Sequence, residues 1–260
     1  MSILDQFNLA GKTAVVAGAR GRYGRQISEA LAEAGARLVL ASSNRPELEK
    51  MAAGLRQSGY DVRAAELDQG SEASILQLKE TVLAECGTVD ILVNNAILRP
   101  MKNWADDAAA FDASMHFNAT GIFLLIRAFG DAMAARGGGS IINIGSIQGM
   151  VGTDGSLYEG LPMAGFIPDY FFHKGGMINL TRTAASYYGP HGVRCNCLSP
   201  GGYYEDTMSP VFVHRYEERT FLGRMANSTD LKGAVVFLAS DASVYVTGTN
   251  LAVDGGYTAK

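Results

Sequence analysis

The sequence has few of the features that mark secreted, membrane or nucleic-acid-binding proteins. Its 260 residues include only three cysteines, Cys86, Cys195 and Cys197, an odd number without the spacing of metal ligands. We expect reduced thiols in or near the core, and no metal site or disulfide framework. Only 18% of the residues are charged, the net charge is −4, and the basic residues are scattered. This composition gives no reason to expect a nucleic-acid or membrane partner.

Long apolar runs are also missing. No stretch approaches the ~18 consecutive apolar residues that span a bilayer. Residues 1–11 include Asp5 and lack the charged-then-apolar pattern of a signal peptide, so we expect a cytoplasmic protein. A chain of 260 residues with 47% hydrophobic content suits one large domain or two small ones, with an ample core.

What the sequence does contain is a glycine-rich turn near its N-terminus. Residues 13–17 form a short apolar run typical of a buried strand, and residues 25–34 carry apolar side chains at helical spacing. Between them lie Gly18, Gly21 and Gly24. Glycines allow positive φ and close approach of a ligand, and a helix N-terminus attracts anions. The turn is therefore a candidate phosphate site, although small glycine turns also end ordinary strands.

Strand-like and helix-like stretches alternate along the rest of the chain. This alternation predicts parallel strands joined by right-handed helical crossovers, an α/β doubly wound sheet forming one domain over residues 1–260. Further strands are expected at 37–41, 62–67, 89–93, 140–144, 193–198 and 250–253, and further helices at 46–58, 71–86, 110–136 (with a break near Asn118), 169–188 and 230–239.

Several polar residues directly follow predicted strands. Ligands of a doubly wound sheet bind at the carboxyl ends of its strands. We therefore expect the glycine turn, Asp68, Asn94, Ser146 and Pro200 to line one crevice.

Tyr170 and Lys174 are four residues apart on a predicted helix and so share one face. A nearby ammonium favours the phenolate and lowers the tyrosine pKa from about 10, which suits general acid–base chemistry near neutral pH. Taken alone, such a pair is more often part of an amphipathic surface. Ser146 alone is a turn serine whose hydroxyl could polarise a carbonyl. Asn118 either fills a helix kink or anchors a water molecule.

Taken together and in this order, the motifs resemble those of the classical short-chain dehydrogenases/reductases. The resemblance covers essentially the whole chain and implies a Rossmann fold. It also implies hydride transfer with a nicotinamide cofactor that interconverts a secondary alcohol and a ketone of a small molecule. The matching segments are the glycine turn, Asp68, Asn94-Asn95-Ala96, Asn118, Ser146, Tyr170-x-x-x-Lys174, Pro200-Gly201, Leu231 to Ser240 and Val253 to Gly256.

The resemblance also implies residue roles. Tyr170 would be the acid/base, Lys174 would lower its pKa and bind ribose, Ser146 would orient the carbonyl, and Asn118 would hold a proton-relay water. Residues 203–226 would form a substrate lid, and the protein would be a homo-oligomer, a tetramer or a dimer. The implied cofactor-binding residues are Gly18, Arg20, Gly21, Arg22, Tyr23, Gly24, Ser42, Ser43, Asp68, Asn94, Ala96, Tyr170, Lys174, Pro200 and Gly201.

The sequence departs from the family pattern in the turn and before Tyr170. Arg22 stands where the family's second glycine is expected, and it could crowd or neutralise the pyrophosphate. The gap from Ser146 to Tyr170 is 24 residues, about twice the usual length. This insert, about 147–169, and the turn together look similar to a branch linked to bacterial surface-sugar and flagellin modification.

The insert brings carboxylates, among them Asp154, Glu159 and Asp169, beside the expected substrate site. Such groups suit a hydroxyl-rich or amino-bearing sugar or polyol. The alternative is a solvated loop that packs on a neighbouring subunit.

The end of the second predicted strand bears on cofactor choice. The segment Ser42-Ser43-Asn44-Arg45 has no carboxylate to bind the ribose 2′-hydroxyl. The serines, with Arg20, Arg22 or Arg45, instead suit a 2′-phosphate, which favours NADP(H), with NAD as the alternative.

Two other functions remain open beside an NAD(P)-dependent oxidoreductase. The same site could oxidise and re-reduce one substrate, as a cofactor-retaining epimerase or dehydratase. Alternatively, the fold could serve a non-catalytic binding protein in which Arg22 blocks the dinucleotide.

Overall fold

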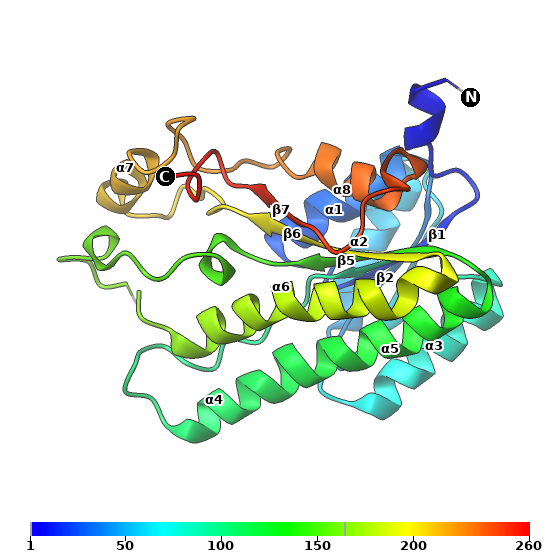
Figure 1. Cartoon of the computed structure of the whole chain (residues 1–260), viewed down its shortest axis with the longest axis horizontal. Coiled ribbons are helices and arrows are strands. Elements are labelled where there is room, and N and C mark those ends of the chain that lie inside the picture. Colours follow the sequence, from blue (N-terminus) through cyan, green and yellow to red (C-terminus); the bar gives the residue numbers. More distant parts are fainter. Residues whose placement is uncertain (1, 164) are drawn as a thin grey trace.

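A seven-stranded parallel sheet forms the centre of the computed structural model, which describes residues 2–163 and 165–260 (Figure 1). The strand order is β3-β2-β1-β4-β5-β6-β7, and every neighbouring pair is parallel. The predicted doubly wound sheet is thereby confirmed. The strands are β1 (Thr13–Ala17), β2 (Arg37–Ser42), β3 (Val62–Glu66), β4 (Ile91–Asn94), β5 (Gly139–Ile144), β6 (Val193–Pro200) and β7 (Asn250–Val253).

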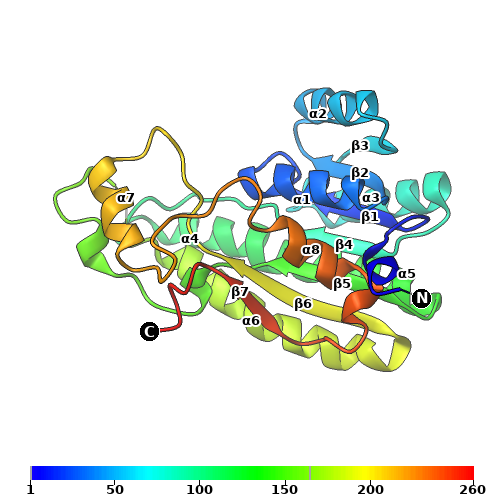
Figure 2. The same ribbon diagram turned by 90° about the horizontal axis from the view of Figure 1, so that it is seen from above.

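Helices cover both faces of this sheet. Helices α1, α2 and α8 lie on one face, and α3, α5 and α6 lie on the other (Figures 1 and 2). The predicted helices and strands are all present, with ends shifted by at most three residues. The helices are α1 (Arg22–Glu33), α2 (Arg45–Gln57), α3 (Glu72–Cys86), α4 (Ala108–Met115), α5 (Gly121–Ala135), α6 (Pro168–Tyr188), α7 (Pro210–Glu217) and α8 (Lys232–Ala239).

The strands are apolar on both sides because both sides are buried. Val16 and Leu40 pack into the core beneath α1, α2 and α8, whereas their neighbours Val15 and Val39 pack beneath α3, α5 and α6. Side chains alternate between the faces of a strand, so a strand covered twice has no polar side. This explains the near-continuous apolar runs in the sequence.

The sheet changes direction at β1. Strand β1 pairs with β2 on one side and with β4 on the other, so the connections leave it in opposite directions. Ligands bind at such a switch point, outside the carboxyl ends of the strands. The segments after β5 and β6 extend from this end, where α7 lies (left in Figure 1).

The long predicted helix at 110–136 contains the break expected near Asn118. A π-helical turn, His116–Thr120, joins α4 to α5. The whole run Ala108–Ala135 is long and apolar enough to cross a membrane by length and composition, although it contains no uninterrupted apolar stretch of that length. Here α5 packs on β4, β5 and its neighbouring helices, and core helices share that composition.

A buried polar chain connects β4, β5 and α6. Asn94 Nδ2 donates to Asn143 Oδ1 at 2.8 Å, and Asn143 Nδ2 donates to Thr181 Oγ1 at 2.9 Å. The Thr181 hydroxyl donates in turn to the carbonyl of Met177 at 2.8 Å. These side chains are almost completely buried, so each hydrogen bond replaces one that water would make. The chain therefore sets where α6 lies against the two central strands.

We expect Asn143→Ala to lower the free energy of unfolding by about 1–3 kcal/mol, because it leaves the buried Asn94 amide without its acceptor. Denaturant unfolding of Asn143→Ala, Asn94→Ala and the double variant measures the coupling between the two residues. A double variant whose loss equals the sum of the two single losses would show that the pair contributes no interaction energy.

Candidate active site

A cleft of about 530 Å³ opens at the carboxyl ends of the central strands. Its walls come from the glycine turn, the segments after β4 and β5, the start of α6 and the segment between β6 and α7. The lining residues are Gly21, Arg22, Tyr23, Asn95, Ile97, Arg99, Ile144, Gly145, Ser146, Ile147, Gln148, Tyr158, Tyr170, Lys174, Pro200, Gly201, Gly202, Tyr203, Met208, Phe212, Tyr216 and Met225.

Three predicted catalytic side chains meet on one wall of this cleft. Tyr170 and Lys174 lie in the first two turns of α6, with the Lys174 ammonium 5.8 Å from the centre of the Tyr170 ring. Lys174 is only 4% exposed, and its Nζ donates to the carbonyl of Ile144 at 2.5 Å. Ser146 follows β5, and its Oγ accepts a hydrogen bond from the Gln148 amide at 3.1 Å. The close packing of α6 on the turn Ile147–Gly149, which follows β5, thus brings the three groups together.

The surroundings of Tyr170 suit proton transfer. Burial alone would raise the pKa of its phenol, but Lys174, Arg99 and the Ser146 hydroxyl outweigh burial and hold the pKa below its ordinary value. Burial also lowers the pKa of the Lys174 ammonium, with the Tyr170 phenolate opposing it. The pair can therefore exchange a proton with a ligand closer to neutral pH than either group in water.

Arg99 is part of this wall and is missing from the sequence-based set. Its guanidinium carbon lies 4.5 Å from the centre of the Tyr170 ring, a cation–π contact. Arg99 belongs to the loop after β4, which has no periodicity. The available signal was its place three residues after Asn-Asn-Ala, at the carboxyl end of a central strand.

The glycine turn fits an anionic ligand. Gly18 has φ +79°, and a Cβ on it would lie 2.3 Å from the backbone of Ala96. A Cβ on Gly24 would lie 2.3 Å from the Gly18 carbonyl, so the turn packs directly beneath α1. Gly21 instead lines the cleft and precedes α1, whose first turn has neither a side-chain cap nor an acidic residue. Its uncapped amides suit a phosphate group, as a dinucleotide cofactor requires.

The comparisons with known proteins agree with this geometry. Residues 18–258 match the family model described as enoyl-(acyl carrier protein) reductase. The sequence is 35% identical over 259 residues to galactitol 2-dehydrogenase (L-tagatose-forming) of Cereibacter sphaeroides, with 97% of each chain covered. The chain belongs to the short-chain dehydrogenase/reductase family. It is therefore an oxidoreductase that uses a nicotinamide dinucleotide to interconvert an alcohol and a ketone.

Solved structures agree as well. The fold matches a gluconate 5-dehydrogenase from Burkholderia cenocepacia J2315 in complex with NADP and tartrate, with a TM-score of 0.90, 32% identity and 100% of each chain covered. An NAD⁺-bound xylitol dehydrogenase matches with a TM-score of 0.85 and 28% identity, covering 95% of this chain and 99% of that chain. This dehydrogenase/reductase thus shares its whole architecture with enzymes holding either dinucleotide.

The Asn118 side chain binds the main chain in this dehydrogenase/reductase. Its Oδ1 accepts from the Leu98 amide at 3.0 Å, and its Nδ2 donates to the Leu98 carbonyl at 2.7 Å and to Ser114 Oγ at 3.0 Å. The amide therefore binds the main chain of the loop after β4. The wider π-helical turn at 116–120 holds this side chain within an otherwise apolar helix, and the binding of a proton-relay water by Asn118 stays a prediction.

The Asn-Asn-Ala segment also differs from expectation. Asn94 is 1% exposed and points into the buried chain with Asn143, so it does not line the cleft. Asn95 lines the cleft instead, and its Nδ2 donates to the Gly18 carbonyl at 2.7 Å. Ala96 contributes its backbone, packed against Gly18. Adjacent strand residues point to opposite sides, which decides between the two asparagines.

The two arginines of the turn are paired with carboxylates. Arg22 forms an ion pair with Glu205, so its side chain turns toward the segment after β6 rather than across the turn. Arg20 pairs with Glu47 of α2. Tyr23 donates to the Gly201 carbonyl at 2.8 Å and thereby joins the turn to the segment that follows Pro200.

The remaining predicted cofactor residues lie at the ends of β2 and β3. Ser43 is exposed, while the Ser42 Oγ accepts a hydrogen bond from the Asn44 amide at 3.3 Å. Asp68 is exposed, and its Oδ1 accepts from the Gly70 amide at 2.9 Å. Ser42, Ser43 and Asp68 therefore lie at the same edge of the sheet as the cleft, but on the side of β1 that is away from Tyr170.

The insert packs onto α7 of the same chain. Arg219 binds both Asp154 and Ser156, and Arg215 donates to the Glu159 carbonyl at 2.7 Å. A small apolar cluster, Ile147, Leu157, Phe212, Tyr216 and Met225, fills the contact. Position 164 of the insert lies outside the described residues.

The insert carboxylates therefore do not form the expected polar substrate surface. The Asp154 carboxylate is bound by Arg219, and Asp169 is buried with no hydrogen-bond partner in the described part of the chain. Among the described residues that line the cleft, none is Asp or Glu.

His173, one helical position before Lys174, is a further buried polar group. Both of its ring nitrogens lack hydrogen-bond partners among the described residues. Burial, followed by the charges of Lys174 and Arg99, lowers its pKa to about 3. The imidazole is therefore neutral at pH 7 and fills space beneath Tyr170, whose ring centre lies 5.4 Å away.

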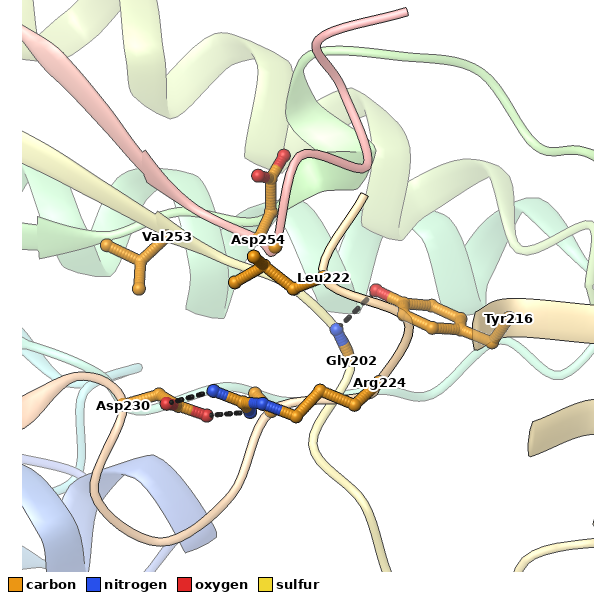
Figure 3. Close-up of a pocket in the computed structure, with 10 residues that line it drawn as sticks. Gly202, Tyr216, Leu222, Arg224, Asp230, Val253 and Asp254 are labelled. Carbon is orange, nitrogen blue, oxygen red and sulfur yellow. Dashed lines mark hydrogen bonds and ion pairs between the residues drawn. The ribbon is translucent and has the colours of Figure 1, made fainter. Parts of the chain in front are cut away.

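A second, smaller cavity of about 80 Å³ lies where the segment 203–226 returns to β7 (Figure 3). The Gly202 amide donates to the Tyr216 hydroxyl at 2.5 Å, and Arg224 donates two hydrogen bonds to Asp230 at 2.7 and 2.8 Å. Binding pockets for small ligands are usually at least about 300 Å³. We therefore attribute this cavity to the packing of residues 203–226 against the end of β7, and not to a ligand site.

We expect the Tyr170 phenol to ionise below its ordinary pKa of about 10. The difference in near-ultraviolet phenolate absorbance between the wild type and Tyr170→Phe, recorded against pH, reports this ionisation. Lys174→Met removes the nearest positive charge, so the same difference titration, now of Lys174→Met against Lys174→Met/Tyr170→Phe, should move to higher pH by about one unit or more. Lys174→Arg, which keeps the charge, should move it less. An unchanged midpoint in Lys174→Met would contradict the electrostatic role.

Proposed function

We propose that this short-chain dehydrogenase/reductase oxidises a secondary hydroxyl of a polyol or sugar acid to the ketone, and catalyses the reverse reduction. The observation that carries the proposal is the meeting of Tyr170, Lys174 and Ser146 on one wall of a cleft beside the glycine turn. The named activities of the relatives, on galactitol, gluconate and xylitol, support this substrate class.

In oxidation, the Tyr170 phenolate accepts the proton of the substrate hydroxyl. The Ser146 hydroxyl donates a hydrogen bond to the same oxygen as it becomes a carbonyl, and the Lys174 ammonium stabilises the phenolate beforehand. A nicotinamide bound beside this wall supplies the acceptor for the hydride that leaves the carbon. Reduction runs with the reverse proton movement, from the Tyr170 hydroxyl to the substrate oxygen.

We propose the glycine turn as the phosphate site and the end of β2 as the site of cofactor selection. Ser42 and Ser43 lie there without a carboxylate, and Arg20 and Arg45 are close in sequence. This supports NADP(H) as the preferred cofactor, although one similar structure holds NADP and another NAD⁺.

Two segments beside the cleft are packed against each other. We propose that residues 203–226 act as the substrate lid and that residues 147–169 move with it, since the two segments are packed together. A homo-oligomer, a tetramer or a dimer, in the cytoplasm stays a prediction of the sequence. The relation to surface-sugar and flagellin modification finds no support among the similar proteins, which include galactitol, gluconate and threitol dehydrogenases.

The two other functions are disfavoured by particular observations. The ion pair with Glu205 draws the Arg22 side chain toward the segment after β6. This argues against a non-catalytic protein in which Arg22 blocks the dinucleotide. The similar proteins include galactitol, gluconate and threitol dehydrogenases, which favours a dehydrogenase over a cofactor-retaining epimerase or dehydratase.

We expect Tyr170→Phe to lower kcat for hydride transfer to or from polyols and sugar acids by about 10²–10⁴-fold, since general acid–base catalysis contributes that much. Binding of NADPH should change little, because only the hydroxyl is lost. Tyr187→Phe, an exposed tyrosine on the same helix, is the matched control and should leave kcat unchanged. Normal turnover by Tyr170→Phe would exclude the mechanism.

We expect Ser43→Asp to shift the ratio of NADPH to NADH affinity toward NADH by about tenfold or more, because a carboxylate repels a 2′-phosphate and accepts a hydrogen bond from a 2′-hydroxyl. Calorimetric titration of both cofactors into the wild type, Ser43→Asp and the neutral control Ser43→Asn measures the ratio. Equal ratios in all three would place the selection elsewhere.

A further inference from the structure

The charged side chains that line the cleft are all positive. Its charged lining residues are Arg22, Arg99 and Lys174, and no described lining residue is acidic. Arg22 is compensated by Glu205, and Lys174 by the Ile144 carbonyl and by the Tyr170 phenol. Arg99 has no ion pair among the described residues, although it lies next to the reacting phenol.

Hydrogen bonds hold the main chain on both sides of the Arg99 side chain. The preceding residue, Leu98, is bound through both its amide and its carbonyl by the Asn118 side chain, at 3.0 and 2.7 Å. The Arg99 carbonyl accepts a hydrogen bond from Lys102 Nζ at 2.9 Å. Its guanidinium lies over the face of Tyr170, 4.5 Å from the ring centre. Arg99 is exposed, so a guanidinium stacked on this ring keeps N–H donors available to a ligand.

We propose that Arg99 binds the carboxylate of the substrate, so that the enzyme acts on polyhydroxy acids in preference to neutral polyols. The inference rests on the proposed oxidoreductase function and specifies its substrate class. A carboxylate matches the guanidinium by two parallel hydrogen bonds. One uncompensated cation suits a single negative charge, which favours a carboxylate over a doubly charged phosphate ester.

The tightest test uses gluconate and sorbitol, which differ only in carrying a carboxylate or a hydroxymethyl group at one end. Wild-type kcat/KM should be at least about tenfold higher for gluconate, because hydrogen bonds to charged groups are worth that much. Arg99→Ala should lower kcat/KM for gluconate by about 10- to 100-fold more than for sorbitol. Measurements are made on the high-pH plateau of each variant, where the effect of Arg99 on the Tyr170 pKa no longer contributes.

Two control variants complete the series. Arg99→Lys keeps the charge but loses the bidentate geometry, so it should restore part of the preference for gluconate. Lys50→Ala removes an exposed positive charge of α2, outside the cleft lining, and should keep the wild-type preference. Sorbitol 6-phosphate is the third substrate probe. A kcat/KM above that of gluconate would replace the carboxylate by a phosphate and overturn the proposal.

Binding separates this inference from the proposed function. Calorimetric titration of gluconate into the complex of Tyr170→Phe with NADPH should give binding that Arg99→Ala weakens by at least about tenfold. Binding with that dependence, but no turnover of any probe by the wild type, would refute the oxidation of polyols and sugar acids alone. Turnover of sorbitol as fast as gluconate, or equal losses for both in Arg99→Ala, would refute the role of Arg99 alone.

Discussion

The buried ammonium of Lys174 constrains the architecture of the site more than any other single group. Taking an ion out of water costs several kcal/mol unless fixed partners replace the water. Here the partners are the Ile144 carbonyl, at the last residue of β5, and the Tyr170 phenol one turn earlier on α6. The start of helix α6 must therefore lie beside the carboxyl end of β5, where α6 packs on β6 and on the turn Ile147–Gly149. The Asn94–Asn143–Thr181 chain reinforces that position from within the core.

A second constraint runs from a helix to a loop. Asn118 interrupts the apolar run between α4 and α5, and its side chain binds the main chain of Leu98 on both sides. The cost of an irregular helix turn is offset by an ordered loop after β4. That order places the Arg99 guanidinium over the Tyr170 ring, where its charge also lowers the pKa of the phenol. Asn118 thus orders the loop through the backbone of Leu98.

The charges near the cleft follow from pairing between segments. Carboxylates of the insert and of the segment after β6 are abundant in the sequence, yet Asp154 is bound by Arg219 and Glu205 by Arg22. These pairs attach the insert to the region of α7 and the glycine turn to the segment 203–226. They also remove negative charge from the cleft walls, which leaves the cleft basic around the reacting phenol.

Local spacing alone determined the alternating α/β architecture, the glycine turn and the Tyr170–Lys174 pair. Strand and helix periods, positive-φ glycines and an i,i+4 pair depend on neighbours in the chain, so they can be predicted without knowing the fold. The tertiary structure decided that Asn95 rather than Asn94 lines the cleft, that Asn118 binds Leu98, and that Arg99 covers Tyr170. Each of these depends on contacts between segments distant in sequence. Their geometry is set by how loops pack at the end of a sheet, which no local pattern encodes.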